Sequence, residues 1–308
     1  MDERVTAPTD CMDKKPDKIE MGEGLQEQSK LWWTENPMSY DWRKTSRQAE
    51  GTREFYDEID ARFFSSSPFF DGDRPFAQLI PFPDLKGRRV LEVGCGLGSH
   101  TQLLAGAGCE VTAIDLTARA VALARHRLAL RGLTAEVRQM DAEHLEFGDE
   151  TFDLVWSWGV IHHSSSPEAI ARQVRRVLKP GGQFRVMVYS KRSLTNYFNL
   201  ARGFVSGKFF RGMSSLEVLS FYADGYIARC YTPREFQELL RASGFAEVET
   251  RILGATYDLV PLPGGGLSGR VKQALVARFP KALSKPLLAY CGSLLFAVAT
   301  KRSGIAGN

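Results

Sequence analysis

The sequence predicts an α/β protein built on a doubly wound parallel sheet, and three observations support this fold class. From Gly87 onward, short apolar segments typical of strands alternate with helical segments, as in βαβ units. The first of these strands runs directly into a glycine-rich turn and then a helix. The 308 residues are 44% hydrophobic and 25% charged, as in globular proteins, which excludes a fibrous or wholly disordered chain.

The N-terminal part divides into two segments of different composition. Residues 1–30 contain eight acidic and five basic residues and no periodic apolar face, so we expect a mobile leader there. Residues 31–85 are dense in aromatic rings and predict a helical lid on the core, with Trp33 and Tyr56 as candidates for ligand contact. Packing of this segment on the core without ligand contact is the alternative.

The segment 86–190 predicts the core. Thr117 is expected to cap a helix that runs to Leu130, and Pro167 to open another that ends at the turn 178–182. A further helix is expected over residues 99–107. The predicted strands are residues 89–93, 110–115, 135–139, 152–157 and 183–190.

Two insertions are expected in the remainder of the chain. Residues 191–231 are aromatic and helical in tendency, and we interpret them as a substrate cap. Residues 232–308 open with a capping box at Thr232 and complete the core with strands over 246–252 and 293–300. Residues of about 255–290 form the second insertion. Four basic residues of the two insertions are interpreted as solvated surface charge or as contacts for an anionic substrate. They are Lys208, Arg211, Lys272 and Arg278.

The glycine-rich turn carries the first chemical signal. Gly94, Gly96 and Gly98 follow the first strand with the spacing G-x-G-x-G, and Glu92 lies two residues before them. A dinucleotide-binding turn would need its third glycine at position 99, which is Ser99. An acid so close to the turn would repel a pyrophosphate and attract a cation. The combination therefore points to S-adenosylmethionine, which has a sulfonium and an ammonium group and no phosphate.

Two further acids follow strands of the same predicted sheet. Asp115 ends the second strand, 21 residues after Gly94, where a carboxylate binds both ribose hydroxyls of a nucleoside. The alternative is interaction with the dipole of the next helix. Asp141 follows the third strand and is expected to accept a hydrogen bond from the adenine amine, the alternative being an ordinary turn residue.

These motifs as a set resemble the class I S-adenosylmethionine-dependent methyltransferases. The resemblance covers residues 88–189 and is carried by the segments LEVGCGLGSH, TAIDLT, QMDAE, FDLVWSWGVIHH and LKPGG. Within the family, these segments are similar to the small-molecule branch, which includes ubiquinone/menaquinone-type and natural-product enzymes. It implies a Rossmann-like seven-stranded sheet of order 3-2-1-4-5-7-6 with strand seven antiparallel. It assigns cofactor contacts to Glu92, Gly94, Gly96, Gly98, Asp115 and Asp141.

Residues beside these positions complete the predicted cofactor site: Cys95, Leu116, Ala142, Ser157 and Trp158. For Cys95 the alternative is a packed loop thiol, and for Trp158 a buried structural ring or a substrate contact. His162 and His163 follow the fourth strand, where the ligand of a doubly wound sheet lies. Because histidine titrates near neutrality, either could remove a proton from the acceptor. The alternative is that one bonds loop backbone and the other lines the cofactor pocket.

The predicted function is methyl transfer to a small-molecule acceptor with apolar or aromatic surface, such as a natural product, quinone or glycolipid precursor. Whether the acceptor atom is O, N or C stays open. A nicotinamide (NAD-type) oxidoreductase and a non-catalytic cofactor-binding protein are the alternatives. No metal is expected, because no ligand cluster with metal spacing occurs beyond the acids assigned to the cofactor.

Composition and charge bear on the partners and the cellular location of the protein. A net charge of +4 is too small a bias to indicate nucleic acid as a partner. The five cysteines form no C-x-x-C pair and their number is odd, so we expect reduced thiols and a cytoplasmic location. The N-terminus lacks a secretory signal, and the longest apolar run, residues 286–299, is too short to span a bilayer. Oligomeric state is left open.

Overall fold

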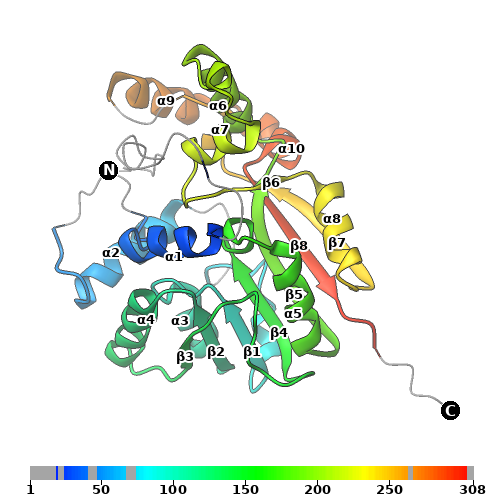
Figure 1. Cartoon of the computed structure of the whole chain (residues 1–308). Helices are drawn as coiled ribbons and strands as arrows, with labels where there is room; N and C mark the ends of the chain where they lie inside the picture. Colours follow the sequence, from blue (N-terminus) through cyan, green and yellow to red (C-terminus); the bar gives the residue numbers. More distant parts are fainter. Residues whose placement is uncertain (1–18, 20–23, 41–46, 67–73, 263–265, 304–308) are drawn as a thin grey trace.

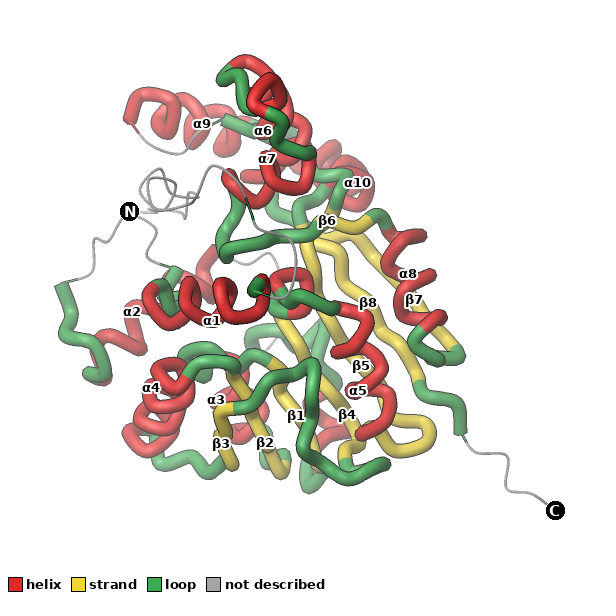
Figure 2. The backbone as a smooth tube through the Cα atoms, in the orientation of Figure 1, coloured by secondary structure: helices red, strands yellow, loops and turns green. Residues whose placement is uncertain are grey.

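An eight-stranded mixed sheet is the middle layer of the structure, a computed structural model that describes residues 19, 24–40, 47–66, 74–262 and 266–303. Helices cover both faces of this sheet, and a group of further helices stands beyond one end of it (Figure 1, Figure 2). The sheet order is β3-β2-β1-β4-β5-β8-β7, and a short β6 pairs with β5.

The strands fall where the sequence predicts them, with small shifts. β1 to β6 pair in parallel, whereas β8 runs antiparallel between β5 and β7. With β7 and β8 as the sixth and seventh strands, the predicted order is confirmed, and β6 is an additional two-residue strand. The bounds are β1 Arg89–Val93, β2 Glu110–Asp115, β3 Glu136–Gln139, β4 Phe152–Trp158, β5 Leu178–Ser190, β6 Cys230–Tyr231, β7 Glu247–Leu253 and β8 Leu294–Thr300.

The helices of the core begin where capping residues predict. Thr117 accepts a hydrogen bond from Ala120 N, and Thr232 forms a complete capping box. Flanking the sheet are α3 Ser99–Gly106, α4 Ala118–Leu130, α5 Pro167–Val177 and α8 Pro233–Ala242, with the short η2 Phe82–Leu85 and η3 Ile161–His163. The insertions contain α6 Leu194–Val205, η4 Phe209–Arg211, α7 Ser215–Tyr222, η5 Thr256–Leu259, α9 Gly266–Arg278 and α10 Lys281–Cys291.

The apolar core has two halves because successive strand residues point to opposite faces of the sheet. On β4, Val155 joins the half that α5 and α8 cover, whereas Leu154 and Trp156 join the half that α3 and α4 cover. On β8, Leu295 and Phe296 divide in the same way. Burial on both faces explains why these strands are almost continuously apolar.

The N-terminal segment differs from the predicted division at residue 30. Most of the expected leader lies outside the described residues, but α1 spans Leu25–Glu35 and buries Leu25, Ser29 and Trp32. The helix thus starts within the segment expected to be mobile, because its few apolar residues find partners in Tyr226 and Ile227. α2 follows over Arg53–Ser66.

The structure also bears on the expected reduced thiols and on the expected absence of a membrane span. Cys95, Cys109, Cys230 and Cys291, the cysteines within the described residues, are free thiols, while Cys11 lies outside them. Within the same residues, no helix combines the length and the apolar character that a membrane span requires.

Candidate active site

A cavity of about 670 Å³ opens at the carboxyl ends of β1, β2 and β4 and extends beneath η5, α9 and α10. In an open α/β sheet this edge is the usual ligand site. Ten of the predicted site residues line the cavity: Trp33, Gly94, Cys95, Gly96, Asp115, Leu116, Asp141, Ala142, Trp158 and His163. Five lie behind its wall: Tyr56, Glu92, Gly98, Ser157 and His162.

The turn after β1 brings backbone to the cavity. Gly94 has φ of 76°, and a Cβ added there would lie 2.2 Å from Val160 Cγ2, so only glycine allows the turn to pack against the loop after β4. Gly96 N donates a hydrogen bond of 3.0 Å to Asp115 Oδ2. The turn and the end of β2 are therefore held together by the same carboxylate that lines the cavity.

Asp115 is fixed on both of its oxygens. Its Oδ1 accepts from Thr117 N at 2.9 Å and from Thr117 Oγ1 at 3.0 Å. Burial raises the pKa of this carboxyl, and the bonds from Thr117 and Gly96 oppose that rise. A carboxylate has about four acceptor positions, so Asp115 retains capacity for a ligand hydroxyl.

Glu92 is placed differently from the expectation that it meets the cofactor directly. Its side chain is 2% exposed, and Thr101 Oγ1 donates to its Oε2 at 2.6 Å. Burial raises its pKa to about 8, and nearby Asp115 adds to that rise. Glu92 thus anchors the first turn of α3 below the glycine turn and does not line the cavity.

Gly98 and Ser157 also belong to the support of the site. Gly98 precedes α3 in the left-handed region, where a Cβ would lie 3.3 Å from the backbone of Ala124. Ser157 is fully buried and donates to Val93 O at 3.2 Å, which ties β4 to β1 at their carboxyl ends. Both fix the turn in place, and neither is exposed to the cavity.

α1 crosses the open edge of the sheet and is hydrogen-bonded to two of its loops. Gln26 Nε2 donates to Asp141 Oδ1 at 3.1 Å, and Gln26 Oε1 accepts from Ser165 N at 3.0 Å. Ser29 Oγ donates to His163 O at 3.2 Å. With Trp33 in the cavity wall, these contacts make α1 a cover over the site. The sequence did not single out Gln26 or Ser29, since both lie in the segment expected to be mobile.

The two histidines are in different environments. The ring of His163 lines the cavity, and its Nδ1–H donates to Ile227 O at 2.5 Å, which leaves the lone pair on Nε2. His162 is fully buried, and neither ring nitrogen has a hydrogen-bond partner among the described residues. Burial, His163 and Arg229 hold the pKa of His162 well below its usual value. Of the two histidines, only His163 is among the residues that line the cavity, and its Nε2 atom is itself buried.

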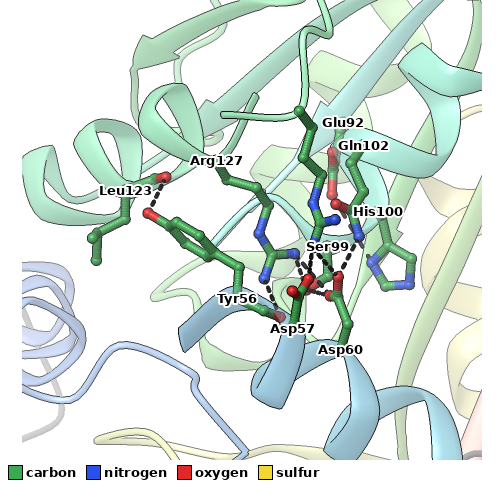
Figure 3. A network of polar contacts seen from close by, with 10 residues as sticks. Tyr56, Asp57, Asp60, Glu92, Ser99, His100, Gln102, Leu123 and Arg127 are labelled. Carbon is green, nitrogen blue, oxygen red and sulfur yellow. Dashed lines mark hydrogen bonds and ion pairs between the residues drawn. The ribbon is translucent and has the colours of Figure 1, made fainter. Parts of the chain in front are cut away.

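Tyr56 does not reach the cavity, which corrects its expected role as a lid contact. It is 1% exposed, and its hydroxyl donates to Leu123 O on α4 at 2.8 Å. Figure 3 shows it beside Arg127, whose guanidinium carbon lies 4.7 Å from the Tyr56 ring centroid. The ring thus packs α2 on α4. Aromatic density alone does not distinguish this role from ligand contact.

A buried polar network joins the same α2 helix to the turn after β1 (Figure 3). Arg127 Nη1 donates to Asp60 Oδ1 at 3.0 Å and to Ser99 Oγ at 2.7 Å. Gln102 Nε2 donates to Asp60 Oδ2 at 2.7 Å. Because Ser99 and Gln102 lie on α3, the network holds the helix that follows the glycine turn against the N-terminal segment.

Aromatic residues also line the cavity, among them Trp158, Tyr189 and Tyr40. Trp158 stacks on the buried Trp156 with centroids 5.7 Å apart, so one face of this ring is occupied by protein. Tyr189, on β5, lines the cavity with its ring 4.1 Å from that of His162. Tyr40 lines it with φ of 56°, a conformation unusual for a residue other than glycine. Tyr189 ends a strand, the position at which a sheet of this kind presents ligand contacts.

Charge in the cavity wall has one sign. Four carboxylates line the cavity, and no lysine or arginine among the described residues does. The four are Asp115, Asp141, Asp224 and Asp258. This wall suits a cationic ligand and opposes a pyrophosphate, which argues against the nicotinamide alternative.

Lys208 and Lys272 are not solvated, in contrast to one of the two interpretations of the insertion charges. Lys272 is 5% exposed, and its Nζ lies 3.3 Å from the ring centroid of Tyr257, a cavity residue. Burial lowers the pKa of Lys272 to about 8, and Asp258 opposes that change. Lys208 is 7% exposed and lies over Phe221. Each amine is covered by an aromatic ring that is not its neighbour in the sequence.

Known proteins resemble this chain over the segment that contains the glycine turn. A family model described as a methyltransferase domain matches residues 91–186. A ubiquinone biosynthesis O-methyltransferase of Roseobacter denitrificans is 31% identical over 181 residues, covering 58% of this chain and 67% of the relative. One of Cereibacter sphaeroides is 36% identical over 110 residues, covering 36% and 43%. The chain thus spans about two fifths to two thirds of the length of these curated relatives.

The solved structures that are similar to this chain include an S-adenosylmethionine dependent methyltransferase from Mesorhizobium loti. It is 21% identical, with a TM-score of 0.49, and the match covers 75% of this chain and 99% of that one. The residues that the family model matches include the glycine turn, Asp115, Asp141 and the His162–His163 pair. The chain belongs to the class I S-adenosylmethionine-dependent methyltransferases.

Proposed function

We propose that this protein transfers the methyl group of S-adenosylmethionine to a hydroxyl of a small acceptor with a large apolar surface. The observation that carries the proposal is the wall of one cavity, in which four carboxylates and the glycine turn occur without a cationic side chain. The curated relatives are named O-methyltransferases, which supports oxygen as the acceptor atom.

The cofactor fits the half of the cavity nearest β1 and β2. Asp115, already oriented by Gly96 N and Thr117 N, would hold the ribose hydroxyls. Asp141, oriented by Glu143 N at 2.9 Å, would accept from the adenine amine. The wall residues Gly94 and Cys95 would border the methionine portion. Bound there, the cofactor supplies an electrophilic methyl group on a sulfonium.

The chain's own contribution is positioning, exclusion of water and movement of one proton. α1, bonded through Gln26 and Ser29 to loops on the far side of the opening, covers the site and keeps water from it. His163, with its Nδ1–H donated to Ile227 O, presents Nε2 as the atom that would accept the proton of the acceptor hydroxyl. The carbonyl of Ile227 keeps the ring in the tautomer that this role needs.

The acceptor would occupy the half of the cavity beneath the second insertion. Val276 of α9, Leu288 of α10 and Leu294 of β8 give this half an apolar wall. Its polar feature is Asp258, whose Oδ2 accepts from Ser293 Oγ and Ala255 N, each at 2.9 Å. An apolar body with one polar group, as in a quinone precursor or a polyketide, matches this lining.

Calorimetry of S-adenosylmethionine binding tests the cofactor assignment. Because Asp115 would provide charged hydrogen bonds worth about 1.5–3 kcal/mol, Asp115→Ala should weaken binding roughly ten- to a hundredfold. Asp149→Ala, an exposed acid in the turn before β4, is the matched control and should bind normally. Unchanged affinity in Asp115→Ala would remove the assignment.

A second measurement tests transfer itself. The wild type is incubated with the cofactor and a panel of phenols and catechols that carry alkyl chains, and S-adenosylhomocysteine is quantified. Acceptor-dependent product is expected. Tight cofactor binding without product from any member of the panel would count against transfer to such hydroxyls.

A further inference from the structure

The exposed apolar side chains of this protein are concentrated on the two insertions. Of the eleven large hydrophobic residues that are exposed among the described residues, all but Leu31 lie on or beside α6, η4, α9 and α10. They are Tyr197, Phe204, Val205, Phe210, Leu267, Val271, Leu275, Leu283, Leu287 and Tyr290. We call the surface formed by these ten residues the cap face. A soluble surface rarely gathers so many apolar side chains without a binding role.

These helices lie together at one end of the molecule. Figure 1 shows α6, α7, α9 and α10 grouped at one end of the sheet. α6, α9 and α10 all contact η5, so they are one structural unit around Thr256–Leu259. The elements that carry most of the cap face are thus packed together around η5.

Two stretches of the insertions contain charged side chains of positive sign only, and the acids of the insertions, Glu217, Asp224 and Asp258, lie outside these stretches. Residues 192–214 and 259–293 contain nine lysines and arginines and no aspartate or glutamate, although the whole chain has a net charge of only +4. Arg211, Arg270, Arg278 and Lys285 are exposed, and none forms an ion pair with another described residue. Apolar side chains interspersed with unpaired cations are the composition of helices that lie on anionic lipid.

The cap face and the cavity share helices. On α9, Val276 lines the cavity and the adjacent Leu275 is 48% exposed. On α10, Leu288 lines the cavity and Leu287 is 43% exposed. Two short helices therefore separate the acceptor half of the cavity from the surface outside.

We propose that the cap face docks on the surface of an anionic lipid bilayer, so that an apolar acceptor dissolved in the lipid reaches the cavity between α9 and α10. The exposed rings and leucines enter the headgroup region, and the four exposed cations contact lipid phosphates. This inference rests on the proposed function for the acceptor, but docking itself needs neither cofactor nor acceptor.

Vesicle sedimentation of the full chain, without cofactor or acceptor, tests docking separately from catalysis. Binding is expected to vesicles of phosphatidylcholine with about one third phosphatidylglycerol. It should weaken strongly on vesicles of phosphatidylcholine alone and at about 1 M salt, where charges are screened beyond ~3 Å. Equal binding under all these conditions, or none to the anionic vesicles, would overturn the proposal.

Two double variants locate the surface. Arg270→Glu with Arg278→Glu should weaken binding at least about 25-fold, since each basic residue near the membrane is worth about fivefold. The matched control is Arg172→Glu with Arg241→Glu, exposed positions on α5 and α8, which should bind as the wild type does. The same loss in both would refute the assigned surface.

Leu283→Ser with Leu287→Ser should weaken binding about tenfold, whereas Leu31→Ser on α1 should not. Sedimentation velocity of the same proteins identifies the competing occupant. A dimer that Leu283→Ser with Leu287→Ser dissociates, in a protein that does not bind vesicles, would assign the cap face to a second copy of the chain and overturn membrane docking. All the substitutions are at exposed sites, and thermal melting checks that folding is retained.

Discussion

The guanidinium of Arg127 on α4 is completely buried and lies 3.0 Å from the carboxylate of Asp60 on α2. The same guanidinium bonds Ser99 at the start of α3, so one cation joins the N-terminal segment to the helix that follows the glycine turn. A buried charge that loses its partner is much more costly than an exposed one. The integrity of the cofactor turn therefore depends on a residue about forty positions before it in the sequence.

Asp60→Ala is expected to lower the free energy of unfolding by about 3–5 kcal/mol, because it leaves Arg127 charged and buried without its carboxylate. Asp57→Ala is the matched control. Asp57 is 55% exposed and pairs with Arg131 at 2.8 Å, and its loss should cost at most about 1 kcal/mol. Urea denaturation of both variants measures the difference. Equal losses of unfolding free energy in the two variants would show that the buried ion pair contributes no more to stability than the exposed one.

Glu92 predicts a stability that declines with pH in the protein without cofactor. Its pKa of about 8 in the fold exceeds the ordinary value of 4.5. Between these values the folded chain retains a proton that the unfolded chain has released, so the free energy of unfolding falls as pH rises, by up to about 1.4 kcal/mol per pH unit. The groups that face this carboxyl are His100, Asp115 and Arg127.

His100 contributes the opposite slope at lower pH. Burial and Arg127 lower its pKa to about 3 from 6.5, so its contribution increases with pH and is complete above about 6.5. The decline due to Glu92 is therefore seen best from pH 6.5 to 8. Urea denaturation in this range should show that Glu92→Gln removes the decline, whereas Glu110→Gln, exposed at the start of β2, leaves it. A wild-type slope in Glu92→Gln would contradict the prediction.

The sequence was sufficient for the sheet and for bringing most of the predicted site residues to the wall of one cavity. Strands, caps and glycine turns are local signals, and a parallel sheet places the residues after its strands along one edge. That rule places Asp115, Asp141 and His163 in one cavity although they are distant in sequence. It does not give the direction of a side chain within the strand, and so it could not show that Glu92 and Ser157 are buried behind the cavity wall.

The rest depends on packing between segments that no local pattern connects. Tyr56 looked like a lid residue because it lies in an aromatic segment, but the direction of its ring is set by α4. Lys272 looked solvated, and it is covered by Tyr257 across an insertion. The leader was expected to extend to residue 30 because that segment has few apolar residues. α1 nevertheless packs on the core through these few residues and adds hydrogen bonds from Gln26 and Ser29.

Val276→Trp tests the division of the cavity into a cofactor half and an acceptor half. A bulky ring in the wall beneath α9 should raise the KM for the acceptor at least about tenfold by filling its space, while cofactor affinity is unchanged. Ala277→Trp, at the next position and exposed, is the matched control and should leave both constants near wild type. Calorimetry and steady-state kinetics separate the two. Loss of cofactor affinity in Val276→Trp would show that the cofactor extends into this half.

His163→Phe and His162→Phe should separate the two adjacent histidines. Phenylalanine retains a ring in each position and removes the nitrogens. His163 lines the cavity with the lone pair of Nε2 available by tautomer, so its loss should lower kcat about 10²–10⁴-fold while cofactor affinity is nearly kept. His162 is buried and held neutral, and its nitrogens have no partner among the described residues, so His162→Phe should keep turnover close to wild type.

The pH dependence of turnover adds a readout that a packing role would not give. A general base makes the rate depend on pH, so the wild type and His162→Phe should both show a pH-dependent rate. His163→Phe should lose that dependence, because the remaining slow reaction relies on positioning alone. If both variants turn over at near wild-type rates, neither histidine is the base, and an acceptor that reacts through carbon or an already ionised oxygen must be considered in place of a neutral hydroxyl.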